Sequence, residues 1–217
     1  MSQSRTYRSP ARAESARQTR RRIVDAARAL FETRGYAGTT IDAVAEAAGV
    51  SRRTVFLSVG SKAELLKTAW DWGVVGDDEP VPMAERPHVL AMQEVTDPHL
   101  LVRLWVEQVL GVADRLAPHE VVLNRAVDAD AEAAALRARI DAERRGGALM
   151  FVTHLAATGG LRDGLAVDEA ADMCWILMNP LLQARLRTDR GWTREAVTGW
   201  LVRMASASLL AGPPAGS

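Results

Sequence analysis

Apolar residues recur along this chain of 217 residues at the three- and four-residue spacing of an α-helix. No segment shows the two-residue alternation of a half-buried β-strand. The clearest apolar stripe lies near the N-terminus, where it consists of Ile23, Ala26, Ala27, Leu30 and Phe31. Only 5% of the residues are aromatic, while alanine and leucine are abundant. The sequence therefore predicts an all-α protein.

Glycines and capping residues divide the first third of the chain into short helices. Side-chain oxygens of serine and threonine satisfy the free N–H groups of a helix start, and glycine accepts the left-handed backbone of a helix end. Two Ser-x-x-Gln/Glu sequences have the spacing of a capping box. The expected helix starts are Ser15 (with Gln18), Thr39-Thr40, Ser51 and Ser61 (with Glu64), and the expected ends are Gly35, Gly49 and Val59-Gly60.

The remainder of the chain is predicted to begin with a linker and to continue as a larger helical domain. Residues 73–87 are rich in proline and acidic residues and show no periodicity. We expect a disordered basic arm over residues 1–14, a small helical head over residues 15–72 and a helical domain over residues 88–211. Further helices are expected to start at Asp97-Pro98, Pro118 and Asp128, to span Asp168–Thr188, and to start again at Thr193.

Charge is distributed unevenly, although the formal net charge is +0. Residues 1–70 contain 13 Lys and Arg against 6 Asp and Glu, and the balance is reversed in the rest of the chain. A basic head joined to an acidic body suggests a polyanionic partner, although a solvated basic tail explains the charge alone equally well. The single Cys174 excludes an internal disulfide, and no apolar run is long enough to span a membrane. We expect a soluble, cytoplasmic protein.

The segment Thr39–Val59 has the residues that a helix-turn-helix requires. Two short helices that cross closely need a small residue at the crossing, which Ala45 provides. The turn needs a residue that tolerates positive φ, and Gly49 is in that position. Val50 and Val55 then anchor the second helix against the head. The N-terminal residues of such a second helix reach base edges in a major groove, and arginine pairs well with guanine.

At this point the sequence resembles the tetracycline-repressor (TetR) family of bacterial regulators over roughly residues 17–70. The resemblance rests on three runs. They are Arg22-Ile23-x-x-Ala26-Ala27-x-x-Leu30-Phe31-x-x-x-Gly35-Tyr36-x-x-Thr39-Thr40-Ile41, Val44-Ala45-x-x-Ala48-Gly49-Val50-Ser51-x-x-Thr54-Val55-Phe56, and Ser61-Lys62-x-Glu64-Leu65-Leu66. The resemblance implies a TetR-type DNA-binding head followed by a helical regulatory and dimerisation domain, acting as a homodimer.

The resemblance also implies which side chains contact double-stranded DNA. They are Thr40, Ser51, Arg52, Arg53, Thr54, Phe56, Ser58 and Lys62, with Lys62 on a phosphate. The family usually has tyrosine where this chain has Phe56, and histidine or tyrosine where it has Ser58. Two phosphate hydrogen bonds are therefore in question. The additional arginines Arg17, Arg20 and Arg21 either compensate through the arm or form a solvated basic face.

The C-terminal part resembles the family only loosely. Its two apolar helices, over Asp168–Thr188 and from Thr193 to Leu210, correspond to the family's dimeric four-helix bundle. The resemblance also implies an unidentified small-molecule effector. Flat tryptophan and flexible methionine side chains suit the wall of a site for an apolar ligand. Core packing explains these residues equally well. The candidate ligand-binding residues are Trp105, Phe151, His154, Met173, Trp175 and Met178.

No sequence motif points to catalysis. The chain lacks a P-loop, a dinucleotide fingerprint and a nucleophile elbow, so we expect no enzyme activity and no cofactor. Glu85-x-x-His88 has one spacing of a di-iron site, but it occurs once and Pro87 interrupts it, so no metal site is expected. Cys174 lies among apolar residues and is interpreted as packing.

The function predicted from the sequence is a transcriptional regulator, a repressor that a small-molecule ligand releases from a palindromic operator. Two alternatives remain open at this stage. One is a DNA-binding regulator that acts without a ligand or as an activator. The other is an all-α module that binds no DNA. The sequence identifies neither the effector nor the operator.

Overall fold

The computed structural model describes residues 10–211, and every named element within them is a helix, which confirms the all-α prediction. One isolated antiparallel bridge joins Leu161 and Leu210. No helix in this part of the chain is long and apolar enough to cross a membrane. The helices are α1 (Pro10–Gly38), α2 (Ile41–Ala48), α3 (Arg52–Ser58), α4 (Lys62–Val75), the 3-10 helix η1 (Met83–Glu85), α5 (Pro87–Gln93), α6 (Pro98–Ala126), α7 (Ala131–Ala157), α8 (Val167–Leu177), α9 (Pro180–Thr188) and α10 (Arg194–Leu209).

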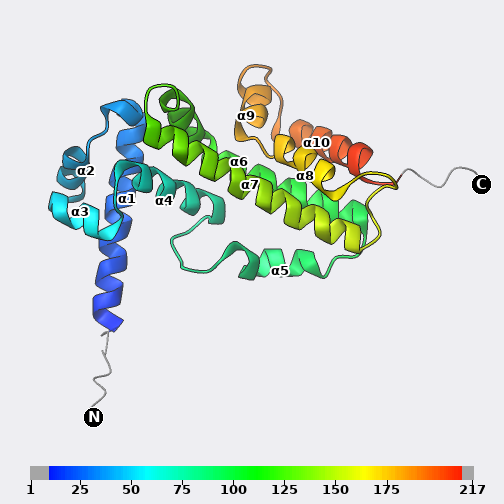
Figure 1. Ribbon diagram of the computed structural model, residues 1–217, viewed down its shortest axis with the longest axis horizontal. Coiled ribbons are helices and arrows are strands. Elements are labelled where there is room, and N and C mark those ends of the chain that lie inside the picture. Colours follow the sequence, from blue (N-terminus) through cyan, green and yellow to red (C-terminus); the bar gives the residue numbers. More distant parts are fainter. Residues whose placement is uncertain (1–9, 212–217) are drawn as a thin grey trace, which may run out of the picture.

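Helices α1 to α4 form a head at one end of the molecule (Figure 1). The apolar stripe predicted for α1 faces inward and packs against α2, α3 and α4. Burial of this apolar surface is what holds the short helices α2 and α3 in place, because helices of seven or eight residues are marginal on their own. The largest fully buried side chains of the head are Ile23, Phe31, Leu65, Leu66 and Trp70, the last with 1% exposure.

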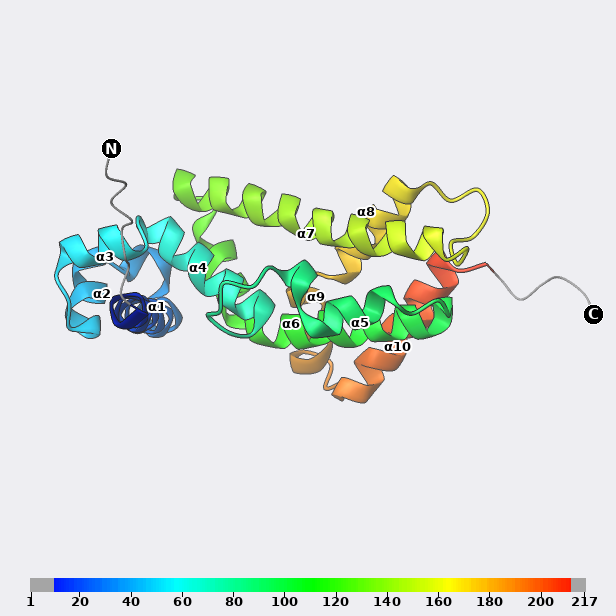
Figure 2. The same cartoon turned by 90° about the horizontal axis from the view of Figure 1, so that it is seen from below.

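Helices α6 and α7 are the two long helices of the body, and the other body helices cover them (Figure 2). Helix α8 packs on α7, while α9 and α10 pack on α6, and α5 lies beside α6. A second apolar core fills the space between these helices, with Leu101, Val106, Leu155, Cys174 and Leu201 among its fully or nearly fully buried members. Helices α1 and α4 of the head both contact α6, so the head is attached to the body along a packed surface.

Most of the predicted helix boundaries in the head are confirmed by capping geometry. The Thr40 side chain accepts a hydrogen bond from Ala43 N, and the Ser51 side chain accepts one from Thr54 N. Gly35 has φ 69° and interrupts the helical geometry, as predicted. The caps predicted at Ser61, Asp97 and Thr193 are also present.

The predicted disordered arm over residues 1–14 is wrong for residues 10–14, because α1 begins at Pro10. Residues 1–9 lie outside the described part of the chain. Ser15 is therefore inside a helix, and its carbonyl accepts a hydrogen bond from the Thr19 hydroxyl rather than a capping box forming there. Proline suits the first helical position, and the Glu14 carboxylate bonds to Arg17 and Gln18 one turn later, at 3.1 and 3.0 Å.

Two predictions based on prolines in the body are also wrong. No helix starts at Pro118, which instead lies inside the continuous helix α6. Buried turns on both sides of this proline keep the helix intact despite the lost N–H group. Conversely, the single helix predicted over Asp168–Thr188 is divided into α8 and α9, because Pro180 forces Asn179 out of helical geometry (ψ 117°).

The helix expected to start at Asp128 starts three residues later, at Ala131, and the Asp130 side chain caps it.

The segment predicted as a loose linker, residues 73–87, is held in a defined conformation. Helix α4 continues to Val75, so the predicted linker starts inside it. Beyond it, the guanidinium of Arg86 is buried and forms an ion pair with Asp77 (Nη2 to Oδ1, 2.9 Å). The same nitrogen donates to the carbonyls of Glu79 and Val81. A buried arginine with this many acceptors orders a loop that lacks apolar periodicity.

His119 on α6 makes the stability of the fold depend on pH. Burial, reinforced by the charge of Arg28 on α1 and partly opposed by the carbonyl of Arg115, lowers the pKa of His119 from 6.5 to about 4. The unfolded chain therefore binds a proton at higher pH than the folded chain does. The contribution of His119 to stability is full above pH 6.5 and falls as the pH falls to 4, by about 3 kcal/mol in total.

We expect urea unfolding of the unmodified chain and of His119→Gln to show this difference directly. Glutamine does not titrate, so the variant should lose less stability than the unmodified chain between about pH 7 and pH 4.5. An identical pH dependence in the two proteins would contradict the buried neutral state of His119.

Candidate nucleic-acid interface

The turn between α2 and α3 has the geometry that the sequence predicts. Gly49 has φ 64°, in the left-handed region that disfavours side chains. Its N–H donates to the carbonyl of Glu46, and the N–H of Val50 donates to that of Ala45 at 2.9 Å. Ala45 is buried in the core of the head. The turn thus fixes the direction in which α3 leaves the head.

Helix α3 is anchored by one face and exposes the opposite one. Val55 is fully buried and connects the helix to the head core. Residues two positions away lie about 200° around a helix, so Arg53 and Leu57 point directly away from this anchor. Arg53 is exposed, and Leu57 is 75% exposed. These two side chains, one helical turn apart, form an exposed ridge along α3.

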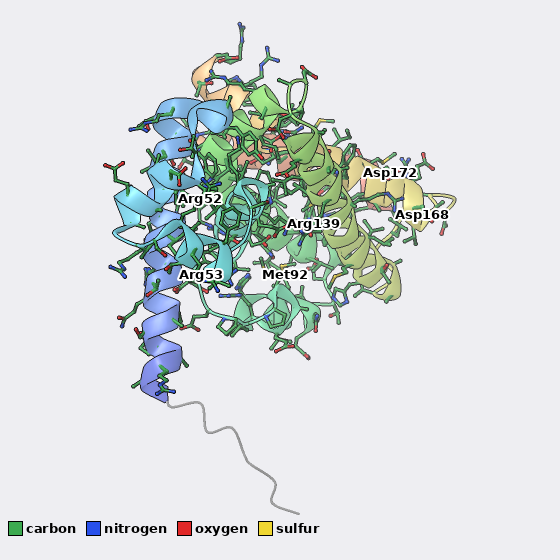
Figure 3. The ribbon with its side chains drawn as sticks, turned by 60° about the vertical axis from the view of Figure 1, so that its left-hand side comes forward. Arg52, Arg53, Met92, Arg139, Asp168 and Asp172 are labelled. Carbon is green, nitrogen blue, oxygen red and sulfur yellow. The ribbon has the colours of Figure 1, made fainter. Side chains whose placement is uncertain are left out.

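The two adjacent arginines of α3 have different surroundings. Arg52 donates from Nη1 to Asp42 Oδ2 on α2 at 2.7 Å, and its guanidinium lies 5.6 Å from the ring centroid of Phe56. Arg53 makes no hydrogen bond or ion pair with any residue in the range 10–211. Figure 3 shows both arginines on the head, away from the acidic residues Asp168 and Asp172 of α8. Neither is covered by the acidic body.

Short polar side chains surround the start of α3 and α2. The hydroxyls of Ser51 and Thr54 are 2.8 Å apart, and Thr40 caps α2 with an exposed side chain. Ser58 is half-buried at the end of α3, and Phe56 is 45% exposed. Helix starts with exposed N–H and hydroxyl groups are suited to phosphate oxygens.

Lys62, predicted to contact phosphate, is engaged within the head in this structure. Its Nζ donates to the carbonyl of Tyr36 at 3.2 Å and lies 4.0 Å from the centroid of that residue's ring. Tyr36 is buried, and burial together with the charges of Asp130 and Glu132 raises the pKa of its phenol, which stays protonated. The ammonium of Lys62 is therefore half-buried at the junction of α1 and α4.

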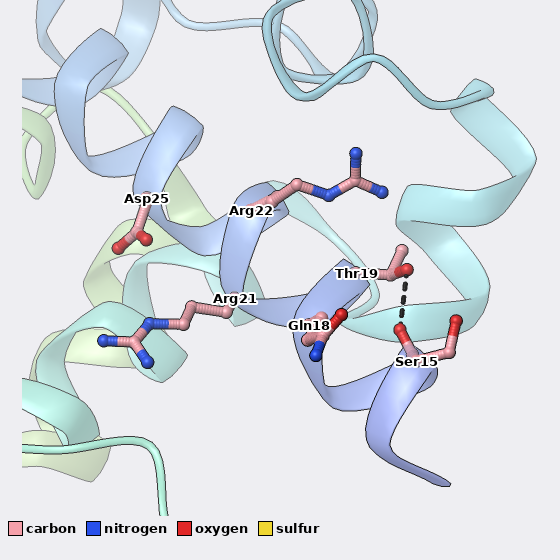
Figure 4. A pocket seen from close by; sticks show the side chains of 6 residues that line it. All are labelled: Ser15, Gln18, Thr19, Arg21, Arg22 and Asp25. Carbon is pink, nitrogen blue, oxygen red and sulfur yellow. Dashed lines mark hydrogen bonds between the residues drawn. The ribbon is translucent and has the colours of Figure 1, made fainter. Parts of the chain in front are cut away.

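The additional arginines Arg17, Arg20 and Arg21 lie on α1. Arg17 pairs with Glu14, and Arg21 lies 4.0 Å from Asp78 of the loop after α4. In both pairs the arginine side chain is exposed to solvent, and ion pairs of this kind contribute little to the stability of the fold. A hollow of about 540 Å³ runs along this part of α1 (Figure 4), lined by Ser15, Gln18, Thr19, Arg21, Arg22 and Asp25.

The candidate ligand-binding residues fall into two groups in the body. Trp105 of α6 and Phe151 of α7 are buried and stacked, with ring centroids 4.6 Å apart. His154, one turn further along α7, lies with its Nε2 3.3 Å from the carbonyl of Val95. The remaining three residues are half-buried on or just after α8, and they are Met173, Trp175 and Met178.

A hollow of about 410 Å³ on the body lies elsewhere, and none of the six residues lines it. Its lining comes from α6 and α10, and consists of Arg103, Glu195, Thr198, Gly199, Val202 and Arg203. In this conformation Trp105 and Phe151 pack against each other as core side chains. A ligand site formed by the six predicted residues therefore stays a prediction.

Two features of the interface do not follow from the sequence analysis. Leu57 was not among the predicted contacts, although its distance of two residues from Val55 is a signal for the opposite helix face. The Asp42 carboxylate was not predicted as the partner of Arg52, because the two are ten residues apart on different helices. Helical periodicity can identify an exposed residue such as Leu57. A partner on another helix, such as Asp42, can be identified only when the angle between the two helices is known.

Comparison with known proteins matches the head to a described family. The family model for bacterial regulatory proteins of the tetR family matches residues 23–69. The curated regulator TtgR of Pseudomonas putida is 41% identical over 58 residues, which are 27% of this chain and 28% of TtgR. The aligned part thus spans less than a third of that relative's length.

Solved structures resemble the fold over most of the chain. A protein from Rhodococcus sp., described as a TetR-family transcriptional regulator, has a TM-score of 0.68 at 17% identity, over 90% of this chain and 99% of that one. FadR from Bacillus subtilis, solved with stearoyl-CoA, has a TM-score of 0.66 at 17% identity, over 87% and 98%. With its turn, its exposed α3 and the match of residues 23–69 to the family model, the head of this chain is a DNA-binding head of the tetR-family type.

Proposed function

We propose that the chain is a DNA-binding transcriptional regulator that inserts α3 into the major groove of an operator. The observation that carries this proposal is the ridge of α3, where Arg53 is exposed and has no partner within residues 10–211. A guanidinium in this position can form two hydrogen bonds with guanine O6 and N7. The caps at Thr40 and Ser51 are suited to phosphates on either side.

Two heads are needed for a palindromic operator, so the proposal includes a homodimer. Recognition helices of such a dimer lie about 34–36 Å apart, one turn of the duplex. Support comes from apolar side chains on the C-terminal helices that a single copy leaves exposed, namely Ile176 on α8 (55%) and Met204 on α10 (40%). A second copy packing on these helices would cover them, as the family resemblance implies.

The proposal also includes release of the operator DNA when a small-molecule effector binds to the body. The contacts between head and body support it, because α4 is bound directly to both long helices. Arg115 of α6 donates to the carbonyls of Gly73 and Val74, and the buried Lys67 of α4 pairs with Glu143 of α7 at 3.0 Å. A ligand that shifts α6 or α7 therefore moves α4 and the distance between the two recognition helices.

The test is selection of duplexes from a random pool with the full-length chain, followed by affinity measurement at fixed salt. We expect enrichment of a palindrome with half-sites about 10–10.5 base pairs apart, centre to centre. Recovery of no enriched sequence would contradict the proposal. A long-chain acyl-CoA, the ligand class seen with FadR, is a first effector probe for release of the selected duplex.

The arginines of α1 give a separate prediction about salt dependence. Replacing Arg17, Arg20 and Arg21 by alanine should weaken binding to selected and random duplexes by the same factor. The slope of log affinity against log salt should fall by about one for each phosphate that the variant no longer neutralises. A matched triple replacement in the body, Arg185, Arg190 and Arg203 by alanine, should leave the slope unchanged. Equal slopes for both triple variants would exclude a phosphate role for α1.

A further inference from the structure

Leu57 is the most exposed large apolar side chain in the described part of the head, and it belongs to neither apolar core. Its exposure is 75%, whereas the anchor of the same helix, Val55, is fully buried. Phe56, the other apolar residue of α3 with an exposed side chain, is partly covered by the guanidinium of Arg52. Leu57 has no comparable cover within residues 10–211, so its side chain is available to a partner outside the head.

We propose that Leu57 contacts the C5-methyl group of a thymine in the major groove, an inference that rests on the proposed function. A leucine side chain neither donates nor accepts hydrogen bonds, so it cannot pair with the polar groups of a base edge. The thymine methyl is the apolar group that the major-groove edge of a base pair presents. An exposed leucine that enters the groove is therefore stabilised by thymine and not by cytosine.

Geometry gives the position of this thymine relative to the guanine read by Arg53. Both side chains lie on the face of α3 opposite Val55, and they are four residues apart. Four residues correspond to about 6 Å along a helix, which is close to two base-pair steps of about 3.4 Å. We therefore infer that each half-site contains a guanine and a thymine within about two base pairs of each other.

The experiment removes the methyl group alone. A duplex selected by the full-length chain is synthesised with deoxyuridine in place of every thymidine, and its affinity is compared with that of the thymidine duplex. Uracil keeps all hydrogen-bonding groups of thymine. Burial of one methyl group corresponds to about fourfold in affinity, so two half-sites should give a loss of about fifteenfold.

Substitution of Leu57 assigns the loss to this side chain. Leu57→Ala should bind the thymidine duplex about fifteenfold more weakly, and it should show no further loss on the deoxyuridine duplex. Its folding should be unaffected, since alanine is at least as good a helix former and the leucine is not in the core. Leu90→Ala, at a 47% exposed position on α5, is the matched control and should retain the full sensitivity to uracil.

The outcomes separate the two proposals. If no duplex is enriched in the selection, the proposed function itself fails. If a duplex is enriched but the unmodified chain binds its deoxyuridine form equally well, the function stands and the role of Leu57 is wrong. The same conclusion follows if Leu57→Ala is as sensitive to uracil as the unmodified chain, because the methyl contact then comes from another residue.

Discussion

Replacing Arg53 by alanine is expected to remove most of the preference of the chain for its selected duplex over random DNA. A bidentate arginine–guanine pair contributes about 1–3 kcal/mol of discrimination per half-site, and a dimer makes two such pairs. The physical reason is that Arg53 is exposed at the ridge of α3 and is not held by any acidic residue among residues 10–211. Competition binding with labelled selected duplex against unlabelled random duplex measures this preference.

Arg52→Ala is the matched comparison for this substitution. The Arg52 guanidinium is held by Asp42 at 2.7 Å and lies on the Phe56 ring, so it would have to leave both to reach a base. We expect the variant to bind both kinds of DNA more weakly, with a smaller change in preference than in Arg53→Ala. A larger loss of preference in Arg52→Ala would reverse the roles of the two residues.

Arg137→Met is expected to destabilise the body by about 3–5 kcal/mol. The Glu120 side chain on α6 is 2% exposed, and its carboxylate accepts from Arg137 Nη1 of α7 at 3.0 Å. The other terminal nitrogen of Arg137 donates to Asn124 Oδ1 at 2.6 Å. Removing the arginine leaves a buried carboxylate without this partner, which costs far more than the loss of an exposed pair. Denaturant unfolding measures the change in free energy.

Two further variants, one on α7 and one that also changes α6, separate this effect from general disruption of α7. Arg139→Met removes an arginine whose side chain is 53% exposed and pairs with Glu64, and it should change stability by less than about 1 kcal/mol. In the double variant Glu120→Gln with Arg137→Met, this buried charge is absent, so most of the lost stability should return. If the double variant is as unstable as Arg137→Met, the cost comes from packing and not from charge.

The sequence predicts the head well because its helix boundaries depend on local interactions. Gly49 and the caps at Thr40 and Ser51 are each satisfied by residues within four positions. Ser15 shows the limit of such patterns. Its spacing to Gln18 fits a capping box, but the preceding residues include good helix formers and extend α1 over it.

The body was predicted less well because its breaks depend on tertiary packing. The turns of α6 on both sides of Pro118 are buried, and this burial outweighs the local preference of proline for a helix start. Near Pro180 the chain is buried as well, with Pro180 and Gln183 both in the interior, yet α8 and α9 separate because the residue before the proline, Asn179, is extended. The partners of Arg52 and Lys62 also come from other helices, so no spacing rule identifies them.

Methylation interference at guanine N7 on the selected duplex tests most directly whether α3 reads the major groove. Methyl groups at N7 project into this groove, where Arg53 is proposed to bind. The result we expect is that methylation of one guanine in each half-site, one helical turn apart, excludes the duplex from the complex, and that Arg53→Ala loses this discrimination. If N7-methylated guanines occur equally in bound and free DNA at every position, α3 does not read the major groove.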